Sequence, residues 1–164
     1  MKHLVIASAI LLAGTCGNSM AGCAASGYTT FLQASANAIN SVLTYRRVNA
    51  TAPDGENWKE DHCTIIGGTA GSGKLFKVGD GTPADPRSLT GKWSLVDING
   101  AAANGWRVRY NYNLGSASDP SLIYTWRLYR KAATGGLCWE DETGNIIASM
   151  PSTPPTIPGS VNCL

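Results

Sequence analysis

The sequence predicts a β-dominated α+β fold, in which one N-terminal amphipathic helix packs on an antiparallel meander that forms a small barrel or a curved sheet. Three observations predict this fold. Apolar and polar residues alternate along residues 106–114 and again along residues 122–131, which is the period of a strand with one buried face. The 164 residues include 19 glycines, 8 prolines, 5 tryptophans and 6 tyrosines, a composition typical of many turns and aromatic-rich strands. A convincing helical period of apolar residues occurs only in residues 28–47.

The N-terminus has the layout of a secretory signal peptide. Lys2 gives a positive start, residues 4–13 are largely apolar and uncharged, and Ser19-Met20-Ala21 fits the small-x-small rule for cleavage after Ala21. The apolar run is shorter than the roughly 20 residues that a membrane-spanning helix needs. We therefore expect residues 1–21 to be a signal peptide, residues 22–150 to form a single domain, and residues 151–164 to be a proline-rich tail.

A second interpretation of the same region is a bacterial lipoprotein processing site, which Met20-Ala21-Gly22-Cys23 resembles. Lipid on Cys23 would leave an odd number of thiols. Cleavage after Ala21 instead leaves an even set that suits two disulfides in an oxidising compartment. These four cysteines are Cys23, Cys63, Cys138 and Cys163. We therefore expect a secreted or periplasmic protein, with a lipid anchor in the cell envelope, and hence membrane contact, as the alternative.

Residues 28–47 are predicted to form the helix because their apolar residues recur at spacings of three and four. These residues are Phe31, Leu32, Ala36, Ile39, Val42 and Leu43. Thr29 or Thr30 could cap its start, and Arg46 and Arg47 suit the negative end of the helix dipole. Its polar face carries Gln, Ser and Asn rather than the Lys and Arg of a membrane-surface helix. We therefore expect one buried face packed against a sheet.

Residues 49–61, NATAPDGENWKED, are predicted to be a polar loop. The sequence Asn49-Ala50-Thr51 matches a glycosylation sequon. Because the signal peptide is of bacterial type, we interpret this match as chance.

The stretch GGTAGSGK, residues 67–74, matches G-x-x-x-x-G-K of a phosphate-binding loop. That loop requires a strand before it, a helix after it, and Ser or Thr after the lysine. Here Leu75 follows Lys74, and the next residues, LFKVGDGTPADP, contain glycines and prolines that oppose a helix. We predict a glycine-rich turn between Thr64-Ile65-Ile66 and the strand-like residues 75–78, and no bound nucleotide.

Strand signals follow one another from Leu89 onward. LTGKWSLVDING ends on an Asn99-Gly100 turn, and WRVRYNYNL and LIYTWRLYRK alternate throughout. Gly135-Gly136 leads into LCWEDE, and Thr143-Gly144-Asn145 leads into residues 146–148. Short strands separated by such turns predict an antiparallel meander.

One of these strands resembles known families. LTGKWSLVDING resembles the first strand of META-type periplasmic domains, and its Gly91-x-Trp93 piece resembles lipocalin-like barrels. The resemblance is confined to these residues. It implies a small exported β-barrel or a curved sheet.

The tail, PSTPPTIPGSVNCL, contains four prolines and is predicted to be extended. Cys163 near its end predicts that a disulfide ties it back to the body. Four cysteines allow three pairings, of which we favour Cys23–Cys63 with Cys138–Cys163. The cysteines are scattered and include no CxxC pair, so neither a metal site nor a cofactor is expected.

The polar faces of the two alternating strands carry the most suggestive charge pattern. Arg107 and Arg109 lie on one strand, and Arg127 and Tyr129 lie on the other, with Lys131 in line. If the strands pair, their cations gather on one surface, which is unfavourable unless something offsets the charge. We take these five residues as candidate binding residues for an acidic partner, either a protein or an anionic glycan.

Two further features of this region can be interpreted in two ways. Glu140 and Glu142 on the next strand could neutralise the arginines in a surface ion-pair network, which would leave no binding surface. The aromatic row is expected to be core packed against the helix, but an exposed row would form a sugar-stacking or protein-docking patch. The row consists of Trp106, Tyr110, Tyr112, Tyr124, Trp126 and Trp139.

No set of residues in the sequence predicts catalysis. Glu60, Asp61 and His62 are adjacent, but neighbours on an extended chain point in alternating directions, so the three do not converge. A nucleophile elbow, G-x-S-x-G, is missing, and the net charge of +2 lacks the basic excess of a nucleic-acid-binding protein. We therefore predict an exported, non-enzymatic binding module with an inhibitor, immunity-like or adhesion role. The alternative is a structural subunit or lipoprotein of a cell-envelope assembly, and a small secreted hydrolase is third.

Overall fold

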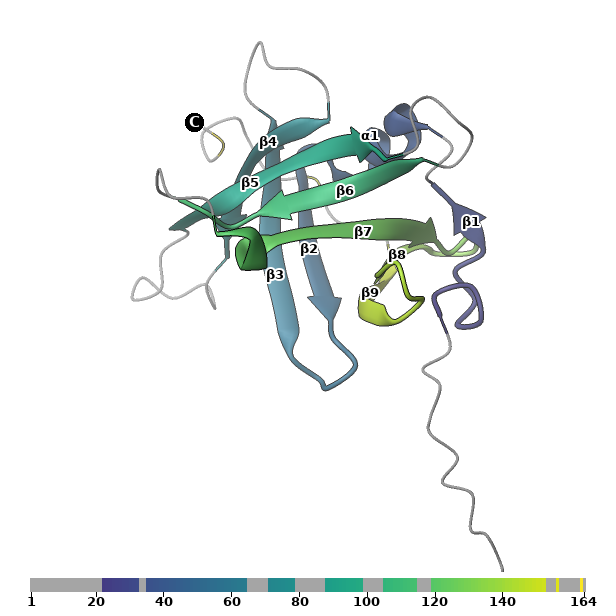
Figure 1. Ribbon diagram of the computed structural model, residues 1–164. Coiled ribbons are helices and arrows are strands. Elements are labelled where there is room, and N and C mark those ends of the chain that lie inside the picture. Colours follow the sequence, from purple (N-terminus) through teal and green to yellow (C-terminus); the bar gives the residue numbers. More distant parts are fainter. Residues whose placement is uncertain are drawn as a thin grey trace, which may run out of the picture.

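The computed structural model describes residues 22–32, 35–64, 71–78, 88–98, 105–114 and 119–152, together with Thr156 and Cys163. The predicted signal peptide lies outside these residues, as does most of the tail. Within them the chain forms nine strands, one α-helix and a short 3-10 turn (Figure 1). In chain order these are β1 (Thr30–Phe31), α1 (Ala36–Leu43), β2 (Arg46–Thr51), β3 (Asn57–Thr64), β4 (Ser72–Lys77), β5 (Ser88–Asp97), β6 (Trp106–Asn111), η1 (Pro120–Leu122), β7 (Ile123–Arg130), β8 (Gly135–Glu140) and β9 (Ile146–Ser152).

Eight of the strands, β2 to β9, close into an antiparallel barrel. Each strand pairs with the next one along the chain, and β2 closes the circuit by pairing with β9 through Thr51 and Ser149. Strand β1 lies outside this circuit and pairs with β7. The predicted β-dominated fold with one helix and an antiparallel meander is therefore confirmed, and of the two forms expected for the meander the structure has the closed barrel. Closure leaves the eight strands without an unpaired edge.

The main hydrophobic core fills the barrel, because alternate side chains of every strand point inward. Trp93, Tyr110 and Trp139 are the largest side chains that are fully buried in it. Five of the six residues of the expected aromatic row belong to this core or pack against it, and the sixth, Tyr124, is exposed at 38%. The row packs mainly against the other strands of the barrel, whereas α1 buries Ile39, Val42 and Leu43. Figure 1 shows α1 beside the end of β5, and the helix contacts β2 and β5.

The helix is much shorter than the predicted residues 28–47. It occupies only Ala36–Leu43, and Thr44 is already extended. Tyr45 then adopts a left-handed conformation, with φ of 53°, and the chain turns into β2. Arg46 and Arg47 therefore lie in a strand rather than in the last helical turn. No helix among the described residues is long and apolar enough to span a membrane.

The prediction of a polar loop over residues 49–61 is wrong. Most of these residues belong to the β2–β3 hairpin, whose turn lies between Thr51 and Asn57. The outward faces of both strands are polar, and the inward face includes Glu60 as well as Val48 and Trp58. A buried carboxylate within the inward set hides the alternation that would identify the strand.

The glycine-rich stretch ends in a strand. Ser72, Gly73 and Lys74 belong to β4 and pair with β5, and β4 continues through Lys77. Residues 65–70 lie outside the described part. The lysine of the G-x-x-x-x-G-K match is thus on a β-strand that continues beyond it, and a phosphate-binding loop would need a helix to start at this place.

The four cysteines form two disulfides, but the favoured pairing is wrong. The bonds are Cys23–Cys138 and Cys63–Cys163. Cys138 and Cys63 both point to the outside of the barrel, on β8 and β3 respectively. Each disulfide therefore fastens a segment near one end of the chain to the outer surface, whereas the favoured pairing joined each terminal cysteine to the wrong strand.

Candidate functional site

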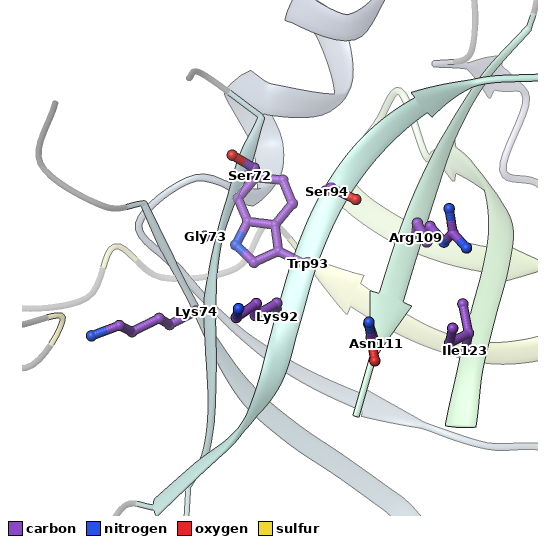
Figure 2. Close-up of a pocket in the computed structure, with 9 residues that line it drawn as sticks. All are labelled: Ser72, Gly73, Lys74, Lys92, Trp93, Ser94, Arg109, Asn111 and Ile123. Atoms are coloured by element: carbon purple, nitrogen blue, oxygen red, sulfur yellow. The ribbon is translucent and has the colours of Figure 1, made fainter. Parts of the chain in front are cut away.

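The outer surface of β4, β5, β6 and the start of β7 carries a hollow of about 650 Å³. Its residues are set out by the register of the strands. Lys74 pairs with Lys92, Lys92 with Asn111, and Asn111 with Ile123. In the adjacent row, Ser72 pairs with Ser94 and Ser94 with Arg109. Figure 2 shows these two rows side by side across the four strands.

Three cations of the hollow lack a counter-charge in the part of the chain that the structure describes. The side chains of Lys74, Lys92 and Arg109 take part in none of its ion pairs or hydrogen bonds. The described residues that line the hollow include neither Asp nor Glu. Lys74 and Lys92 are directly opposite each other on antiparallel strands, an arrangement in which like charges destabilise a sheet. In Figure 2 the Lys74 side chain extends away from Lys92, as mutual repulsion favours.

The floor of the hollow depends on a close approach between β3, β4 and β5. Gly73 has no room for a side chain, because a Cβ there would lie 1.5 Å from the carbonyl oxygen of Cys63. Trp93, which pairs with Gly73, donates its indole N–H to the same oxygen at 3.2 Å. This indole is 1% exposed. Trp93 therefore supports the hollow from within the barrel and offers little ring surface to a ligand.

One disulfide lies on the outer surface of the barrel on each side of the hollow. The segment after Gly22 lies over β8, where Cys23 is bonded to Cys138 and its backbone N–H donates to Glu140 Oε2 at 2.8 Å. On the other side Cys163 is bonded to Cys63 of β3. The outward side chains of Lys92 and Arg109, on two of the four strands between these disulfides, are exposed.

Four of the five predicted binding residues lie elsewhere and have other contacts. Arg107 and Arg127 both bind Glu142, at 2.6 Å and 2.9 Å, so that this carboxylate bridges them. Tyr129 donates its hydroxyl to Glu140, and Lys131 lies 5.6 Å from the centre of the Tyr28 ring. Of the five predicted residues, which are Arg107, Arg109, Arg127, Tyr129 and Lys131, only Arg109 lines the hollow.

The ion-pair network that we set out as the alternative is therefore present for Arg107 and Arg127. The hydrogen bond from Arg107, together with both positive charges, lowers the pKa of Glu142 below its ordinary value. Arg127 also contacts Glu140 at 3.3 Å. Because the Glu142 side chain is 46% exposed, solvent screens these pairs, and we expect them to contribute little to stability.

A second polar cluster lies inside the barrel. Tyr112 donates its hydroxyl to Glu60 at 3.1 Å, and Trp139 donates to the hydroxyl of Tyr110, which lies 3.1 Å from His62 Nε2. Burial raises the pKa of Glu60 to about 7 and lowers the pKa of His62 to about 3. The exposed fractions of these two side chains are 5% and 0%. Both are therefore poorly placed to reach a substrate.

The expected divergence of Glu60, Asp61 and His62 is correct only in part. Asp61 points outward and binds Arg47 through two hydrogen bonds of 2.8 Å and 3.0 Å. Glu60 and His62 are two positions apart in a strand, so they share the inward face. No group of three or more His, Cys, Asp or Glu side chains among the described residues is arranged to hold a metal ion.

Sequence reasoning missed Lys74 and Lys92. Lys74 was considered only as part of the phosphate-loop match, and Lys92 as part of a strand. The sequence does indicate that both lysines point outward, because each stands between inward-pointing residues of its own strand. Their side-by-side position follows from the β4–β5 register, which the sequence does not specify.

Comparison with known proteins finds no matching family model, no matching curated protein and no matching solved structure.

Proposed function

We propose that this protein is an exported, non-enzymatic binding module that holds an anionic partner in the hollow on its outer surface. The observation that carries the proposal is the group of three cations, Lys74, Lys92 and Arg109, which have no acidic partner in the described part of the chain. A cationic concavity raises the local concentration of an anion and speeds its association. Strand pairing holds the backbones of the three residues on adjacent strands, so little backbone ordering is required on binding.

Export is supported by the cysteines. Two disulfides are compatible with an oxidising compartment outside the cytosol. The sulfur of Cys23 is bonded to Cys138, and the same sulfur cannot carry a lipid. We therefore favour a soluble secreted or periplasmic protein over a lipid-anchored one. The mass of the native protein distinguishes a free start at Gly22 from a lipidated Cys23.

An enzymatic role has less support. Glu60 and His62 are the acid–base residues that share a face, and both are enclosed in the barrel among aromatic rings. A general acid or base must reach the proton that it transfers, directly or through one water. We therefore assign no catalytic residue.

Titration calorimetry with three polyanions and a neutral polymer tests the proposal. The polyanions are sulfated dextran, a carboxylated polysaccharide and poly-L-glutamate, and the neutral polymer is dextran. We expect the wild-type protein to bind at least one polyanion, more weakly as salt rises because the Debye length falls from about 10 Å at 0.1 M to about 3 Å at 1 M. Dextran should not bind.

Two triple variants with the same net charge locate the site. Lys74→Gln/Lys92→Gln/Arg109→Gln removes the cations of the hollow and should abolish binding. Lys59→Gln/Lys77→Gln/Arg130→Gln removes three cations that do not line the hollow, and should bind like the wild type. The proposal is wrong if no polyanion binds, or if both triple variants lose binding equally.

A further inference from the structure

The polar groups that line the hollow are mainly hydrogen-bond donors. Besides its three cations it contains Ser94, whose hydroxyl has no partner among the described residues. Asn111 accepts two hydrogen bonds at its Oδ1 from Asn113, one from the backbone N–H at 2.9 Å and one from the side-chain amide at 2.8 Å. With the oxygen occupied, the NH₂ group of Asn111 is the part of its amide that remains for a ligand. A surplus of donors fits a ligand rich in acceptor oxygens.

The spacing of the cations fits several separate anionic groups better than one. Directly opposite residues on antiparallel strands have Cβ atoms about 5 Å apart, and diagonal neighbours are about 7–8 Å apart. Lys74 and Lys92 are opposite, whereas Arg109 is the diagonal neighbour of Lys92, since Lys92 pairs with Asn111. One anion can lie between the two lysines and a second one near Arg109. A ligand with repeated negative charges would use both places.

The hollow lacks the features of a typical protein-docking or nucleic-acid-binding surface. Protein interfaces depend on aromatic or apolar anchors at their centre, and single-stranded nucleic acids stack their bases on exposed rings. Among the described lining residues, Ile123 is the apolar side chain on the outer side, and Trp93 is the aromatic one and is 1% exposed. Charged and hydroxyl groups on a flexible chain without large apolar groups suit this lining best.

We propose that the ligand is an anionic polysaccharide that lies across β4, β5 and β6, with one acidic group between Lys74 and Lys92 and another near Arg109. This inference depends on the proposed function and specifies its partner. Sulfate, carboxylate and phosphate share the acceptor oxygens that lysine and arginine recognise. The sugar hydroxyls between the acidic groups can accept from Ser94 and from the Asn111 amide.

The test is a competition experiment at matched charge. Sulfated dextran and poly-L-glutamate of similar chain length and equal number of charges compete with a fluorescent sulfated dextran for the wild-type protein. We expect the polysaccharide to compete at a concentration at least about 10-fold lower than the polypeptide, since two additional donor contacts suffice for that ratio. Ser94→Ala should reduce this preference and leave the salt dependence unchanged, because serine carries no charge.

Each result is decisive. A preference for sulfated dextran that is lost with the Lys74/Lys92/Arg109 triple variant and retained with the Lys59/Lys77/Arg130 variant supports the polysaccharide. Equal or tighter binding of poly-L-glutamate, lost with the first triple variant, overturns this inference and leaves the proposed function standing. Binding of neither polymer, or binding that survives removal of the three cations, overturns both.

Discussion

At the scale of single residues, the interior of the barrel holds two titratable groups whose pKa values move in opposite senses. Glu60 and His62 are both buried, and burial disfavours the charged form of each. The pKa of Glu60 therefore rises to about 7, and the pKa of His62 falls to about 3. Both groups are neutral between these values, so neither places a charge in the interior of the barrel at mildly acidic pH.

The Glu60 carboxyl should make the protein less stable as the pH rises from about 4.5 to about 7. The pKa of Glu60 in the folded protein is higher than the ordinary value of 4.5. The stability that the protonated carboxyl contributes is therefore fully present below pH 4.5 and is lost as the pH rises through the folded pKa. We expect Glu60→Gln to unfold like the wild type at pH 4.5. At pH 8 the variant should be more stable by up to about 3 kcal/mol. Urea unfolding at both pH values measures the difference.

The control for this prediction is Glu56→Gln, which changes an exposed carboxyl near the β2–β3 turn. Its stability should follow that of the wild type at every pH. His62 acts in the opposite sense, because its lowered pKa removes stability as the pH falls from 6.5 towards 3, and this effect is shared by the wild type and both variants. Parallel pH profiles for the wild type and Glu60→Gln would show that Glu60 is not a buried acid.

At the scale of secondary-structure elements, strands with a clean alternation could be predicted, and strands with polar interior residues could not. Strands β5, β6 and β7 lie where the sequence indicates, because their inward residues are nearly all apolar or aromatic. Strand β3 was missed, since Glu60 and His62 point inward among polar neighbours. Strand β2 was missed because its first residues, Arg46 and Arg47, were assigned to the end of the helix. The helix was predicted too long because Phe31 and Leu32 continue its apolar period. In the structure these two residues precede the helix, and Tyr28 donates its hydroxyl to the Met150 carbonyl.

A side chain introduced at Gly73 of β4 tests how closely β3 and β4 are packed beneath the hollow. In Gly73→Ala the new methyl group would meet the Cys63 carbonyl oxygen, so β3 and β4 must separate, and we expect a loss of about 3 kcal/mol. Gly55→Ala is the matched control. Gly55 has a positive φ of 92° with open space around it, so only backbone strain of about 1 kcal/mol is added. Thermal unfolding compares the two, and an equal effect would contradict the packing explanation.

At the scale of the whole molecule, the candidate site is a product of the pairing of β4, β5, β6 and β7, and this explains why the sequence predicted so little of it. Arg109 was among the predicted binding residues, but its neighbours Lys74 and Lys92 come from strands whose register the sequence does not reveal. In the β6–β7 pair, Arg107 and Arg127 each lie next to a member of the Val108–Trp126 pair, on the same side, and Glu142 contacts both arginines. Two of the predicted binding cations are therefore already paired. The number of cysteines predicts two disulfides but not their connectivity, because Cys23 and Cys163 are bonded to strands that are distant in sequence.

The two disulfides should stabilise the molecule without forming the site. They join residues separated by 115 and 100 positions, and closing loops of that length contributes about 4–5 kcal/mol each in the chain-entropy model. We expect Cys63→Ser/Cys163→Ser to lower the free energy of unfolding by about 2–5 kcal/mol. At temperatures where this variant is folded, sulfated dextran should bind with unchanged affinity, because Lys74, Lys92 and Arg109 are positioned by strand pairing. Cys23→Ser/Cys138→Ser is the companion variant and should behave in the same way. A loss of binding confined to the variant without the Cys63–Cys163 bond would mean that the tethered tail takes part in recognition, and that the hollow alone is not the whole site.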